Sequence, residues 1–325
     1  DFSDKDEGAQ IIAHNIEPIG TDKNVILLSR KAKYNNSEFE DASKVTSRIV
    51  AQNRSWWDKV KANTSGLAFE TQIVDRFAGF ERLAKYLEPL KGTQMMFYLR
   101  QYDQRMNLVS DSVANGAPAL VEKTRKDGQI ERMVESKDGA SLSGVVTTLK
   151  DAKQYIGNGE AVNQMFTTYL AAIRAANKGI DSLNFGTDKD GKPILTQADL
   201  DKITNLVEKN KPLKDIFNKA RSEYNEYNRN LIKFLVDTGA LDQATANRLV
   251  REDDYIPFYR QRNGVAELLI GSESPIYIGS IKEQPYLQEL VGGDQPILDF
   301  MTSSVQNTNL LLDMGLRNLA TKNAV

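Results

Sequence analysis

The feature that most constrains the fold is a run of apolar residues at seven-residue spacing between positions 212 and 237. Its members form two neighbouring stripes, Phe217, Tyr224 and Leu231 beside Ala220, Tyr227 and Phe234. A repeat of seven keeps both stripes on one side of an α-helix. We therefore predict one continuous helix over 212–237 as the central rod and the most buried element of the protein, with Tyr224 and Leu231 among its least exposed residues.

Apolar residues spaced by three, four and seven positions predict further helices along the chain. The predicted ranges are 37 to about 60, 67–88, 93–114, 143–156, 159–178, 196–208, 242–250 and a last helix that begins near Pro296. End signals support several of them. Thr196 and Asp199 have the spacing of a capping box, and Asn115-Gly116 is a typical helix C-terminus.

Two Asp-Gly dipeptides, Asp127-Gly128 and Asp190-Gly191, lie between short segments that favour strands. This dipeptide suits the type I′ turn of a two-stranded hairpin. We expect one hairpin near 119–134 and a second over 182–195. Because isolated two-stranded ribbons are marginally stable, both should lie at the periphery of the helical body.

The composition of the chain fits this view. The 325 residues, 40% hydrophobic and 26% charged, are enough for a substantial core. The sequence thus predicts a mainly α protein, an elongated multi-helix bundle with two small β-hairpins. We expect an irregular arm over 1–36, an N-terminal helical subdomain over 37–180 and a C-terminal helical subdomain over 181–325. The absence of an initiator methionine before Asp1, and an amphipathic pattern still running at Val325, suggest a piece of a longer polypeptide.

Charge and cysteine content exclude several classes of function. Lys and Arg number 42 against 44 Asp and Glu, so no overall basic field attracts nucleic acid. The chain has no cysteine, which excludes disulfides, thiolate catalysis and cysteine-based zinc sites. There is no apolar run near 18 residues, the length that suggests a membrane span. Nothing indicates a cofactor.

The candidate catalytic and metal-binding residues each have a simpler explanation. His14, the single histidine, has no serine and acid arranged around it. Gly186–Gly191 resembles part of a calcium loop, but the first and last ligand positions are a glycine and a glutamine, and a hairpin turn explains it. The acids of Arg251–Asp254 point in different directions and suit a solvated turn. Trp56-Trp57 fits core packing better than base stacking. We therefore assign no catalytic, cofactor or metal residue.

The strongest candidate for a functional cluster is an aromatic and basic segment around a proline. It comprises Tyr255, Pro257, Phe258, Tyr259, Arg260 and Arg262. Pro257 fixes φ and stiffens the backbone, so the segment should be a rigid extended element. Two interpretations are open. In the first, Arg260 binds backbone carbonyls or an acid and the rings fill a gap between helices, as an internal clasp; in the second, the cluster contacts single-stranded nucleic acid or a partner peptide.

Several short blocks carry a resemblance to a known family. They are Val74–Phe77 with Glu81–Leu83, Tyr169–Gly179, Tyr227–Gly239 leading into Tyr255–Arg260, and Gly293–Ile297 with Asn318–Ala320. In this order, over about 67–325, the chain resembles the helical domain of large polyvalent proteins of bacteriophages and conjugative elements. Such proteins are very long, and the resemblance implies a segment packaged or transferred with phage or plasmid DNA, often beside helicase, methylase, peptidase or polymerase modules. It assigns no catalytic residue to this segment.

The resemblance and the residues together predict a non-enzymatic structural and interaction module of a large phage internal virion, or ejection, protein. Its expected partners are other modules of the same polypeptide and other virion proteins, and its expected location is the virion and then the host cell after genome delivery. A nucleic-acid-contacting module that uses the 255–262 cluster is the alternative. An enzyme with an acid pair in a cleft is a third possibility.

Overall fold

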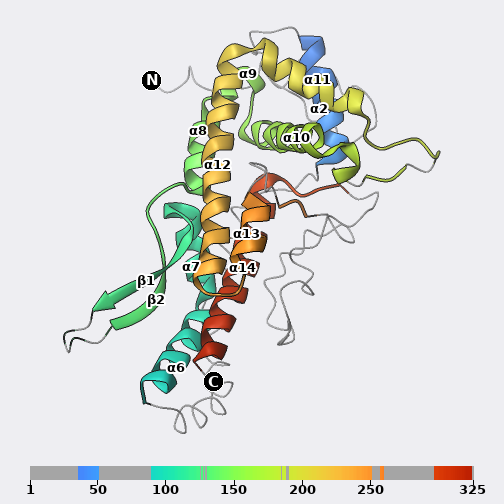
Figure 1. Ribbon diagram of the computed structural model, residues 1–325. Helices are drawn as coiled ribbons and strands as arrows, with labels where there is room; N and C mark the ends of the chain where they lie inside the picture. Colours follow the sequence, from blue (N-terminus) through green and yellow to red (C-terminus); the bar gives the residue numbers. More distant parts are fainter. Residues whose placement is uncertain are drawn as a thin grey trace, which may run out of the picture.

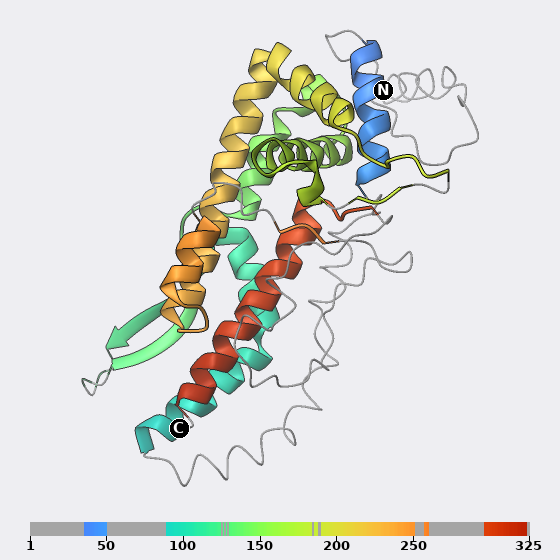
Figure 2. The same ribbon diagram turned by 45° about the vertical axis from the view of Figure 1, so that its right-hand side comes forward.

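A computed structural model describes residues 36–50, 89–124, 126, 128, 130–183, 185–187, 190–250, 257–259 and 296–323. Over this part the protein is mainly helical, with one two-stranded sheet (Figures 1 and 2). The mainly α prediction is confirmed. Several predictions fall outside the described residues. They include those on the 1–35 part of the arm with His14, the pair Trp56-Trp57, the 67–88 helix and the acids of 251–254.

The long helix α12, Lys211–Asp237, is the rod that the seven-residue repeat predicts. It begins where the side chain of Asn210 accepts a hydrogen bond from the Leu213 N–H (3.3 Å). It ends just before Gly239, whose φ of 71° suits only glycine without strain. Tyr224 and Leu231 are completely buried, as predicted.

Among the helices that the structure describes, the most buried is nevertheless α14, Phe300–Lys322, so the prediction that α12 is the most buried element is wrong. More than two thirds of the residues of α14 are buried, against fewer than half in α12. Helix α14 packs against α6, α7, α10 and α12 and buries polar as well as apolar side chains, whereas α12 keeps a polar face with residues such as Lys219 in solvent.

Further helices lie toward the N-terminal half of α12 (Figure 1). They are α2 (Asn36–Ile49), α8 (Leu142–Lys150), α9 (Lys153–Ile156), α10 (Gly159–Lys178), a 3-10 turn (Ile180–Leu183) and α11 (Gln197–Lys209). Helix α13 (Gln243–Val250) packs beside the C-terminal half of α12. Helix α10 runs between α12 and α2 (Figure 1). The predicted capping box is present at Thr196 and Asp199. Helix α2 is shorter than predicted, because Val50 pairs as an isolated parallel bridge with Ile297.

The predicted 93–114 helix is two helices, α6 (Pro89–Asp103) and α7 (Arg105–Asn115), with a break at Gln104. Gln104 has φ −87° and ψ 12°, outside helical values. The break places Arg105 over the ring of Tyr102, 4.7 Å from its centroid, and Arg105 Nη1 donates to the Tyr102 carbonyl (3.3 Å). The spacing of apolar residues does not reveal local side-chain contacts of this kind, so it did not predict the break.

The first predicted hairpin is confirmed as β1 (Pro118–Thr124) and β2 (Ile130–Ser136), paired antiparallel. Its base belongs to the core, because Val134 is fully buried, while Ile130 near the tip is 58% exposed. The second predicted hairpin, 182–195, is wrong. Its described residues contain only one antiparallel bridge, Thr187 with Pro193. A proline has no N–H to donate, which stops a ladder from continuing.

Candidate functional site at the start of helix α14

Three segments that lie far apart in the sequence meet just before α14. The Ile297 N–H donates to the Ile49 carbonyl at the end of α2 (2.8 Å), and the Leu298 N–H donates to the Tyr259 carbonyl (2.7 Å). Successive N–H groups of an extended chain point to opposite sides. Residues 296–298 therefore lie between the end of α2 and the 257–259 segment, and we call this meeting point the junction.

The junction contains the part of the predicted cluster that the structure describes. Pro257 and Phe258 are buried, with Phe258 only 7% exposed, and Tyr259 is half-buried. The Tyr259 hydroxyl donates to Asn307 Oδ1 on α14 (3.3 Å). The other cluster members, Tyr255, Arg260 and Arg262, lie outside the described residues. Both interpretations of Arg260, clasp and nucleic-acid contact, therefore stay predictions.

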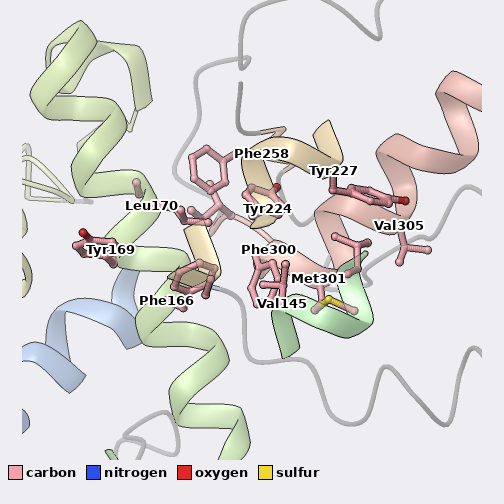
Figure 3. Close-up of a cluster of buried hydrophobic side chains, with 14 of the residues drawn as sticks. Val145, Phe166, Tyr169, Leu170, Tyr224, Tyr227, Phe258, Phe300, Met301 and Val305 are labelled. Atoms are coloured by element: carbon pink, nitrogen blue, oxygen red, sulfur yellow. The ribbon is translucent and has the colours of Figure 1, made fainter. Parts of the chain in front are cut away.

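An aromatic cluster lies beside the junction and joins α10, α12 and α14 (Figure 3). The ring centroid of Phe166 lies 5.1 Å from that of Phe300 and 5.3 Å from that of Phe217, both edge to face. Tyr224 meets Phe300 in the same geometry at 5.7 Å. Such pairs add about 0.5–1.5 kcal/mol beyond their buried area. Phe300, the first residue of α14, is thus held by the two other helices at once.

The N-terminus of α14 is fixed by its cap, Asp299. One carboxylate oxygen accepts hydrogen bonds from the N–H groups of Met301 and Thr302 (both 3.1 Å) and from Asn163 Nδ2 on α10 (3.0 Å). The Phe300 N–H donates to Thr167 Oγ1, also on α10 (2.9 Å). These contacts satisfy donors that a helix start otherwise leaves unpaired.

Further along, polar side chains of α14 face tyrosines of α12, an arrangement we call the polar seam. Ser304 Oγ donates to the Tyr224 hydroxyl (3.0 Å), and the Tyr227 hydroxyl lies 2.8 Å from Thr308 Oγ1. Burial raises the pKa of Tyr224 to about 12 and also raises the pKa of Tyr227. Sequence reasoning missed the seam. Its α14 residues belong to the polar runs Thr302-Ser303-Ser304 and Asn307-Thr308, which by themselves do not predict burial.

A charged cluster joins the far half of α14 to α6 and α7. Arg317 Nε binds Asp313 (3.0 Å) and Arg317 Nη2 donates to the Tyr102 hydroxyl (2.6 Å). Arg105 Nε lies 3.8 Å from the same aspartate. Burial, and then the negative charge of Asp313, raise the pKa of Tyr102. The cluster thus links three helices through one carboxylate and one ring.

In the part of the chain that the structure describes, the polar contacts of this region are hydrogen bonds and ion pairs between helices. Within the described ranges no three or more His, Asp or Glu side chains are placed to hold a metal. In the same part of the chain, no helix is both long and apolar enough to cross a membrane.

Comparison with known proteins gives no match. No family model, no curated protein and no solved structure resembles the chain closely enough to be counted.

Proposed function

We propose that the chain is a non-enzymatic structural and interaction module of a large phage internal virion protein that is delivered with the genome. Its partners are other modules of the same polypeptide and other virion proteins. The proposal rests on the sequence blocks that resemble the helical domain of phage and conjugative-element polyvalent proteins. It also rests on the polar groups of the described residues, which form hydrogen bonds and ion pairs between helices.

The observation that carries the structural part of the proposal is the direction of the pKa shifts. Proton transfer at neutral pH needs groups whose pKa lies near 7. Here burial raises the pKa of Tyr98, Tyr102, Tyr224 and Tyr227, all of which are neutral at pH 7 in the first place. Hydrogen bonds from Thr196 and Arg48 outweigh burial and lower the pKa of Asp199, which holds it ionised. Each of these shifts moves the pKa of its group further from 7.

The phage part of the proposal is tested in particles. Particles made by the genetic element that encodes the chain are purified, treated with nuclease and protease to remove surface material, and searched for peptides of the chain by mass spectrometry. We expect these peptides inside the particles at a fixed ratio to the capsid protein. Peptides found in the producing cells but absent from the treated particles would contradict the proposal.

A further inference from the structure

We draw no further inference here: the strongest candidate, the charged cluster of Tyr102, Arg105, Asp313 and Arg317 where α14 meets α6 and α7, belongs to the site already described, and its charged groups pair with one another there as helix contacts.

Discussion

Helices α12 and α14 lie side by side in the core and reach that position in different ways. Helix α12 has an apolar stripe and a polar face, and the polar face, with Lys219, is in solvent. Helix α14 has no polar face in solvent, and its buried residues include serines, threonines and asparagines. A helix with one buried face can be recognised from its own spacing of residues. A helix buried on every side depends on partners that its own sequence does not contain.

The largest expected effect comes from breaking the start of α14. Phe300→Ala removes the ring that meets both Phe166 and Tyr224, and should lower the free energy of unfolding by about 3–5 kcal/mol. The matched change on the solvent face of α12, Lys219→Ala, should alter it by less than about 0.5 kcal/mol. Chemical denaturation followed by circular dichroism measures both. A small loss in Phe300→Ala would mean that α14 is held mainly by contacts further along the helix.

A smaller effect is expected where Gly315 of α14 lies against Phe234 of α12. A Cβ at Gly315 would lie 2.5 Å from Cε1 and Cζ of Phe234, so Gly315→Ala should cost about 1–3 kcal/mol despite the better helix propensity of alanine. Shortening the opposing side chain should recover part of this loss. The double variant Gly315→Ala with Phe234→Leu is therefore expected to be more stable than the sum of the two single changes predicts. Strict additivity in thermal melts would show that the close contact is not what limits position 315.

The polar seam should contribute less than the aromatic cluster. Tyr227→Phe removes a buried hydrogen bond to Thr308 and should cost about 1 kcal/mol. Thr308→Val alone should cost a similar amount or more, since Tyr227 then keeps a buried hydroxyl without its partner. If the pair acts together, the double variant should be less destabilised than the sum. A double-mutant cycle from denaturant unfolding gives the coupling energy between Tyr227 and Thr308. A value of zero would show that the two residues contribute to stability independently.

The last expected effect is the response of the polar seam to alkali, which contributes no change in stability at neutral pH. The pKa of Tyr224 is about 12 in the folded protein and 10.0 in a model compound, so folding disfavours the tyrosinate. Its contribution to stability is fully present below pH 10 and is lost as pH rises from 10 toward 12. The variant Tyr224→Phe with Tyr227→Phe should therefore lose less stability than the original chain over this interval. Parallel curves of unfolding free energy against pH would contradict the raised pKa values.

Local signals in the sequence were sufficient wherever a residue acts on its own neighbours. The repeat of Phe217, Tyr224 and Leu231 predicts α12 almost to its ends, and Thr196 with Asp199 predicts the start of α11. The first Asp-Gly turn predicts the position of the β1–β2 hairpin. In each case the physical cause, a helical period, a cap or a turn, lies within a few residues of the element that it determines.

Tertiary structure alone decided the burial of α14 among its neighbouring helices. It also decided the junction, where Ile49, Tyr259 and the 297–298 segment meet although some 200 residues separate the first two. The sequence marked Pro257, Phe258 and Tyr259 as an unusual rigid segment. It contained no sign that a serine-rich and asparagine-rich helix would fill the centre, because a buried polar side chain is stable only beside a partner, and that partner is supplied by another part of the chain.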